Sequence, residues 1–93
     1  MLEKDIVAAI MKYLRLLPEC FCFKMHGGMY SQAGIPDIIC CYKGNFIAFE
    51  VKTEKGKAAG LQIATIQKIN RAGGNAQIVR SLDEVKEIMD KLD

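Results

Sequence analysis

Two apolar segments, residues 37–42 and 46–52, flank a short polar stretch that contains Gly44 and Asn45. Both segments are rich in β-branched and aromatic residues, which is typical of two strands joined as a hairpin. A two-residue turn at Gly44-Asn45 would pair Lys43 with Phe46. This hairpin constrains the fold more than any other feature, because its register decides which side chains share a face.

Asp37, Glu50 and Lys52 are predicted to project from one face of this hairpin. Successive side chains of a strand point to opposite faces, and the Gly44-Asn45 turn places Asp37 opposite Lys52 and Ile39 opposite Glu50. The two carboxylates are then diagonal neighbours, about 7–8 Å apart at the backbone. The prediction requires an even number of turn residues. The opposite face is predicted to join the core through Ile38, Cys40, Tyr42, Ile47, Phe49 and Val51.

The charged face has two interpretations. Alternating Glu and Lys are common on a solvated sheet face, where they have no chemical role. The same face also holds Ile39, Cys41 and Ala48, which favours cover by a helix and partial burial of the carboxylates. Buried carboxylates are costly unless they are paired or bound to a metal ion, and a cation relieves the repulsion between them.

Two carboxylates and a lysine on one face suit hydrolysis of a phosphodiester with a divalent metal ion. Magnesium takes carboxylate, water and phosphate oxygens as ligands, and a bound metal ion activates water and stabilises charge on the phosphate. Nucleophilic catalysis of the Ser/His or Cys/His type would depend wholly on His26, the one histidine. No glycine-rich phosphate loop is present, and a chain of 93 residues has little room for a sugar cleft.

The remaining elements are predicted from apolar periodicity and turn residues. A first helix over residues 2–17 ends at Pro18, and a short strand covers 21–25. After the hairpin come a helix with apolar residues from Leu61 to Ile69 and a strand over 76–79. The second helix is closed by Gly73-Gly74, and Ser81 and Glu84 form a capping box for a last helix. The expected order is α-β-β-β-α-β-α, an α/β fold in which helices flank a mixed sheet.

Composition places the chain among globular proteins and excludes little else. It is 51% hydrophobic and 26% charged, and 93 residues predict one domain. The net charge of +2 is too small to indicate a nucleic-acid partner by itself. No apolar run reaches the roughly 18 residues of a membrane span, and the acidic, amphipathic N-terminus is not a targeting peptide. The expected location is inside the cell, with no membrane partner.

The quoted segment GIPDIICCYKGNFIAFEVK contains Pro36-Asp37 followed by Glu50-x-Lys52, which resembles the PD-(D/E)XK nuclease motif. Together with LQIATIQKINRAGGNAQIVRSLDEV, it resembles the VRR-NUC family, the virus-type replication-repair nucleases of that superfamily. The resemblance extends from Leu2 to about Ile88 and includes Gly34, Gln62 and Ala72-Gly73-Gly74. It implies a PD-(D/E)XK nuclease-like core and a single VRR-NUC-like nuclease domain over residues 1–93.

The resemblance implies a metal-dependent DNA endonuclease, selective for branched DNA such as four-way (Holliday) junctions, that acts in phage-type replication or repair as a homodimer. It implies that Asp37, Glu50 and the Val51 carbonyl bind Mg²⁺ or Mn²⁺, with Glu3 reaching the metal directly or through water. Lys52 would position or activate the water, and Gln62 would lie over the site. The predicted contacts to nucleic acid are Lys55, Lys57, His26, Tyr30 and Ser31.

Several alternatives stay open at the level of sequence. Glu3 also suits the N-terminus of a helix, where acids are favoured by the helix dipole, and Gln62 suits an ordinary helix surface. The lysines and the loop residues also suit a solvated surface. The main functional alternative is a nucleic-acid-binding module of the same fold that does not cleave. An assembly protein and a restriction-type nuclease are further candidates, although the chain has few elements for reading base edges.

Overall fold

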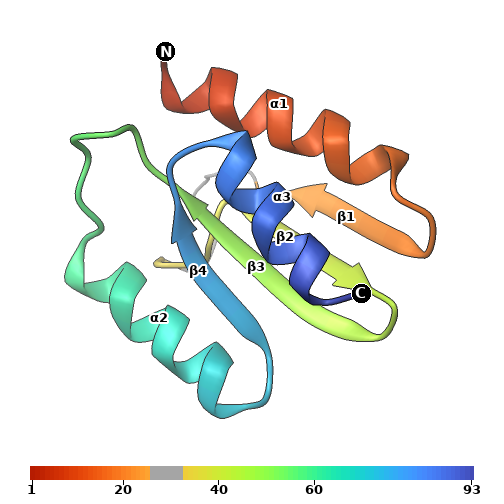
Figure 1. Ribbon diagram of the computed structural model, residues 1–93. Helices are drawn as coiled ribbons and strands as arrows, with labels where there is room; N and C mark the ends of the chain where they lie inside the picture. The colour runs from red at the N-terminus through yellow and green to blue at the C-terminus, as the bar shows by residue number, and fades with distance from the viewer. Residues whose placement is uncertain (26–32) are drawn as a thin grey trace.

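The computed structural model describes residues 1–25 and 33–93 and confirms the predicted order of elements (Figure 1). The element boundaries lie within one or two residues of those expected from the sequence. The helices and strands are α1 (Glu3–Leu16), β1 (Cys20–Lys24), β2 (Ile38–Tyr42), β3 (Asn45–Val51), α2 (Gly60–Arg71), β4 (Asn75–Val79) and α3 (Leu82–Lys91).

The four strands form one mixed sheet in the order β1-β2-β3-β4. The pairs β1–β2 and β2–β3 are antiparallel, whereas β3 and β4 are parallel and connected through α2. Helices α1 and α3 pack on one face of the sheet, and α2 lies beside β4 on the other (Figure 1). Within the described residues, no helix is long and apolar enough to cross a membrane.

The core lies between the sheet and the pair α1–α3. Helix α1 contributes five buried apolar residues at helical spacing, and α3 contributes Val85 and Met89. The sheet residues predicted to face the core are all buried, as expected from strand alternation. They are Ile38, Cys40, Tyr42, Ile47, Phe49 and Val51.

The predicted register of the hairpin is wrong by two residues. The turn residues are Lys43 and Gly44, with φ of 51° and 85°, and Tyr42 pairs with Asn45. A two-residue hairpin of this type needs positive φ at both central positions, and glycine accepts that conformation without strain. Ile39 therefore pairs with Ala48, not with Glu50. Because both turns contain two residues, the same side chains still share each face.

Glycines end α2 as the sequence predicted. Gly73 adopts φ of 98°, and the N–H of Gly74 donates to the carbonyl of Ile69 at 3.0 Å, which is the bonding pattern of a Schellman motif. Helix α2 has no fully buried residue. The Asn70 side chain instead ties it to β4, donating to the Ala76 carbonyl at 3.1 Å and accepting from the Ala76 N–H at 2.7 Å.

The N-terminus of α3 differs in part from the expected capping box. Ser81 Oγ accepts a hydrogen bond from the Glu84 N–H at 3.2 Å, as predicted. The Glu84 carboxylate accepts from the N–H of Arg80 at 3.2 Å instead of that of Ser81. Ser81 therefore caps α3 as predicted, but the hydrogen bond of the Glu84 carboxylate goes to Arg80, the residue before the cap.

Candidate active site

Asp37 lies directly before β2, in a segment that Gly34 brings against α2. Gly34 has φ of 86°, and a Cβ atom there would lie 2.8 Å from the Leu61 carbonyl oxygen and from Thr65 Oγ1. A side chain at this position would require both the strained backbone and a displaced helix. The glycine in the Gly-x-Pro-Asp motif therefore has a structural reason, since it lets α2 approach the segment that carries Asp37.

Backbone and side-chain bonds hold Asp37 between the ends of two strands. Its carboxylate oxygen Oδ2 accepts from the Val51 N–H at 2.8 Å, and its carbonyl oxygen accepts from the Met25 N–H at 2.8 Å. The β2–β3 register, continued by one residue, places Asp37 opposite Glu50. The two carboxylates thus face each other directly, which is closer than the diagonal arrangement predicted from sequence.

Glu50 is the one buried charged residue in the described part of the chain, with 2% of its surface exposed. Its oxygen Oε2 accepts from Gln62 Nε2 at 3.1 Å and lies 3.6 Å from Lys52 Nζ. Its other oxygen, Oε1, is buried and has no hydrogen-bond partner among the described residues. A buried carboxylate oxygen without a partner is energetically costly, so this site favours a bound cation.

The electrostatics of Glu50 agree with that geometry. The pKa of its carboxyl group is raised to about 7, mainly by burial and then by the facing Asp37, while the Lys52 ammonium opposes the rise. Near neutral pH the group therefore exchanges between acid and carboxylate. A divalent cation competes for the same oxygens as the proton, because metal ligands must be deprotonated.

Lys52 and Gln62 approach Glu50 from different elements. Lys52 follows β3, is anchored by its N–H to the Val79 carbonyl at 3.0 Å, and exposes 15% of its side chain. Gln62 lies in the first turn of α2, where its Oε1 accepts from the Ala59 N–H at 2.8 Å while its Nε2 donates to Glu50. Both ends of the Gln62 amide are therefore bonded, which orients Glu50 Oε2, while Oε1 keeps no partner in the part of the chain that the structure describes.

The other residues predicted for metal binding have different surroundings. Val51 has a buried side chain, and its N–H bonds to Asp37, so its backbone lies beside the carboxylates. Glu3 is exposed at the first residue of α1. Among residues 1–25 and 33–93, no group of three Asp, Glu, His or Cys side chains is arranged to hold a metal ion.

Of the predicted nucleic-acid contacts, the structure describes Lys55 and Lys57. Lys55 and Lys57 are exposed in the segment between β3 and α2. His26, Tyr30 and Ser31 lie outside the residues that the structure describes.

Arg80 was not singled out from the sequence, although it anchors the lysine-bearing loop. Its Nη1 donates to the carbonyl oxygens of Thr53 at 2.6 Å, Gly56 at 2.7 Å and Glu54 at 3.2 Å. The sequence feature that could have identified this role is the position of Arg80 directly after the apolar strand β4. Since the carboxyl ends of parallel β3 and β4 lie at the same edge of the sheet, Arg80 is placed to reach the loop that follows β3.

The comparisons with known proteins define the fold. Searches with the sequence found no matching family model and no matching curated protein. Two solved structures are similar over most of the chain. One, a "VRR_NUC domain", has a TM-score of 0.78 and 20% identity, covering 95% of this chain and 94% of the other. A "VRR_NUC domain protein" has a TM-score of 0.77 and 18% identity, covering 97% of this chain and 86% of the other.

The chain therefore has the fold of these VRR_NUC domains, a mixed four-stranded sheet flanked by helices. The fold that the sequence motif implied is confirmed. The residues of the motif also fit a divalent cation, because two carboxylates face each other and one buried oxygen has no partner among the described residues.

Proposed function

We propose that this protein is a metal-dependent DNA endonuclease of the VRR-NUC family, which hydrolyses phosphodiester bonds. The observation that carries the proposal is Glu50, a buried carboxylate that faces Asp37 and keeps Oε1 without a partner among the described residues. A solvated sheet face does not explain this burial. The VRR_NUC fold of the chain supports the same class of function.

Each residue of the site has a defined part in this proposal. Asp37 and Glu50 would hold Mg²⁺ or Mn²⁺, with the Val51 carbonyl as a third ligand, and an ion held there supplies a Lewis acid for the water and the phosphate. The Lys52 ammonium positions or activates the attacking water. Gln62 keeps the Glu50 carboxylate oriented through its 3.1 Å hydrogen bond. Glu3 remains a candidate for water-mediated contact with the metal.

Lys55 and Lys57 are proposed to bind backbone phosphates near the scissile bond. Both are exposed, and Arg80 holds their loop through hydrogen bonds to the carbonyl oxygens of Thr53 and Gly56. Such contacts contribute affinity and salt dependence without reading the base sequence. His26, Tyr30 and Ser31 are proposed as further contacts to the nucleic acid.

The test compares wild type with Asp37→Asn on labelled four-way junction, flap and linear duplex DNA. With Mg²⁺ or Mn²⁺ the wild type should cleave, and EDTA should abolish cleavage. Asp37→Asn should lose about 10³-fold or more, because loss of a ligand exceeds the 10–100-fold effect of a residue outside the ligand set. The variant retains an acceptor for the Val51 N–H, so it should fold normally. Metal-independent binding with no cleavage of any substrate by wild type would instead favour the non-catalytic module.

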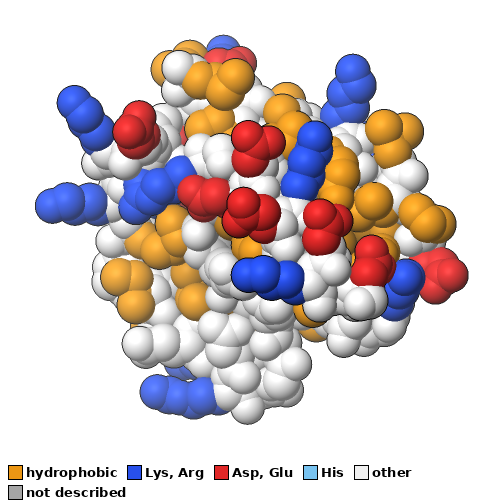
Figure 2. All heavy atoms as spheres, in the orientation of Figure 1, with side chains coloured by type: hydrophobic (Ala, Val, Ile, Leu, Met, Phe, Trp, Pro, Cys, Tyr) orange, Lys and Arg blue, Asp and Glu red, His pale blue; other side chains and the backbone are white. Residues whose placement is uncertain are grey.

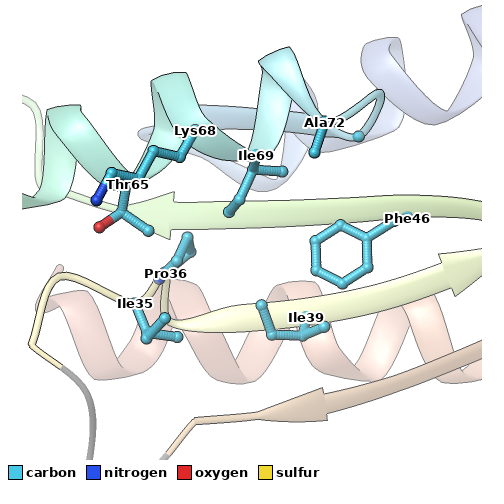
Figure 3. A pocket seen from close by; sticks show the side chains of 9 residues that line it. Ile35, Pro36, Ile39, Phe46, Thr65, Lys68, Ile69 and Ala72 are labelled. Atoms are coloured by element: carbon cyan, nitrogen blue, oxygen red, sulfur yellow. The ribbon is translucent and has the colours of Figure 1, made fainter.

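Selectivity for branched DNA and action as a homodimer form the finer part of the proposal. A two-fold dimer presents two sites to two strands. An uncovered apolar face supports it, since Phe21 is 71%, Phe46 47% and Phe23 43% exposed on the α2 side of the sheet. Beside them lies a groove of about 450 Å³, where Phe46, Ile39, Ile69 and Ala72 converge (Figure 3). Exposed apolar surfaces of this kind mark interfaces.

The dimer is tested by the mass of the protein in solution. Phe21→Lys should convert a dimer to a monomer, whereas Leu16→Lys, at a leucine that is 78% exposed on α1, should not. The monomeric variant should nick a junction on one strand without the paired cut. A wild type that is monomeric at micromolar concentration would refute this part alone. A neighbouring helicase or primase gene would support a role in phage-type replication or repair.

A further inference from the structure

A groove of about 420 Å³ runs along α1 and is closed at one place by Lys24 of β1. Four of its eight lining residues are basic and none is acidic, although the whole chain has nearly balanced charges. We call this groove the α1–β1 track. Its basic residues are Lys4, Lys12, Arg15 and Lys24.

The basic residues of the track are arranged along one line. Lys4, Lys12 and Arg15 are spaced so that they share one side of α1. They span about 16 Å of the helix axis at ~1.5 Å per residue. Duplex DNA rises ~3.4 Å along its axis for each phosphate of a strand, so this length spans about five base pairs of a duplex.

One end of the track adjoins the candidate active site. Lys24 is the last residue of β1 and pairs with Ile38, the residue that follows Asp37. The next residue, Met25, donates its N–H to the Asp37 carbonyl at 2.8 Å. The side chain of Ile38 faces the core, so the track lies on the α1 side of the sheet, whereas the carboxylates lie on the α2 side. A polymer bound along the track would therefore reach the carboxylates by passing around this end of the sheet.

Among the described residues, no cation of the track forms an ion pair. The ion pairs within residues 1–25 and 33–93 are Lys43–Asp93 and Lys52–Glu50, and neither involves the track. Four like charges in one groove repel each other, and an anionic ligand relieves that repulsion. In contrast, acidic side chains gather over α3 (Figure 2), which carries Asp83, Glu84, Glu87 and Asp90 and would repel a phosphate backbone.

We propose that the α1–β1 track binds the backbone phosphates of a duplex arm that extends away from the cleavage site. The identity of the polymer rests on the proposed nuclease function, whereas the site itself rests on the four cations. A membrane surface fits less well, because a membrane-bound helix inserts its apolar face into the bilayer. The apolar face of α1 is already used in the core through Ile6, Ile10 and Leu14.

The test measures binding with Ca²⁺ in place of Mg²⁺, using a fluorescent junction with long arms. Lys12→Gln/Arg15→Gln removes two track charges, and Arg71→Gln/Lys91→Gln removes two charges from the last turns of α2 and α3 as a matched control. The track variant should bind about 30-fold more weakly at 0.15 M salt, and its plot of log K against log salt should be less steep by about 1.8. The control should change affinity by less than about 3-fold, since distant exposed charges are screened.

Arm length gives a second readout that a general charge effect does not produce. Shortening the arms should weaken binding by wild type and by the control, but it should affect the track variant much less. If the two effects are not additive, the track substitutions and the shortened arms remove the same contacts between protein and DNA. The proposal for the track would be refuted if the track and control variants lost equal affinity, or if the affinity of wild type did not depend on arm length.

The outcomes separate this inference from the nuclease proposal. Cleavage by wild type together with unchanged binding by the track variant would refute the track alone. Reduced binding by the track variant without any metal-dependent cleavage by wild type would refute the nuclease alone. Sedimentation with phosphatidylserine vesicles tests the membrane alternative. A track variant that loses vesicle binding but keeps DNA binding would show that the groove binds membranes and not DNA.

Discussion

The two faces of the central sheet differ in what covers them. On one face, α1 and α3 bury an almost wholly apolar surface, including Phe49 and Val51 at 0% exposure. On the other, α2 has no fully buried residue and lies mainly beside β4, with a hydrogen bond from Gln62 to Glu50 of β3. That face carries the carboxylates at one end, and Phe21 and Phe46 are exposed towards the other end.

This difference separates the tasks of the two faces. The covered face supplies the hydrophobic stabilisation that a chain of 93 residues needs. The α2 face tolerates a buried Glu50 whose repulsion with Asp37 is a cost to folding, because the other face offsets it. Functional sites often carry such costs, whereas structural faces avoid them.

The largest expected effect contrasts two phenylalanines of the same strand. Phe49→Ala should destabilise the protein by about 3–5 kcal/mol, because Phe49 is fully buried and its removal leaves a cavity. Phe46→Ala should lower the free energy of unfolding by less than about 1 kcal/mol, because Phe46 is 47% exposed on the other face. Urea unfolding of dilute, monomeric protein measures both. Similar costs for the two would contradict the division between the faces.

The next effect is the pH dependence of stability that arises from Glu50. Because its pKa is raised to about 7 in the folded protein, the folded state holds the proton more tightly than the unfolded state. The stability that this proton contributes is therefore fully present below the unfolded pKa of about 4.3, and it is lost as the pH rises through 7. Glu50→Gln removes this loss, so in EDTA at pH 8 it should be more stable than wild type by up to about 3 kcal/mol.

Urea unfolding between pH 4 and 8 checks this expectation. The two proteins should have similar stability at the acid end and diverge towards pH 8. Mg²⁺ should stabilise wild type at pH 8 and have little effect on Glu50→Gln, because binding of a ligand to the folded state adds stability. A pH-independent difference between them would contradict the link between burial and the raised pKa.

The smallest effect concerns Gln62, which acts on Glu50 and not on substrate in our proposal. Gln62→Ala should lower the cleavage rate about 10–100-fold, the usual effect of losing a partner that orients a ligand. It should also move the acid limb of the pH–rate profile upwards, because Gln62 donates to the carboxylate form of Glu50. Gln67→Ala, an exposed glutamine of the same helix, provides the control. An unshifted profile would indicate that Gln62 is only a helix cap.

Local patterns predicted much of this molecule. Apolar spacing identified all seven elements, and Gly73-Gly74 identified the end of α2. Strand alternation placed Asp37, Glu50 and Lys52 on one face although the register was wrong, since a shift by two residues preserves which residues share a face. The turn was misplaced because Lys43 adopts positive φ, a conformation that its residue type does not favour.

Contacts between distant segments were not predictable in the same way. The hydrogen bonds of Arg80 to the β3–α2 loop and of Gln62 to Glu50 depend on how elements pack in space. No local pattern records those distances. The α1–β1 track likewise joins Lys24 to residues of α1 that precede it by nine or more positions, and only the docking of α1 on β1 brings them together.

The amino-acid sequence by itself determined the elements, their order and the face on which the charged residues lie, because these follow from local backbone preferences and from the periods of helix and strand. The tertiary structure alone decided that Asp37 lies opposite Glu50, that Glu50 is buried with Oε1 lacking a partner among the described residues, and that four cations form one groove. These properties depend on burial and on distances across the sheet. They arise only when separate segments pack together.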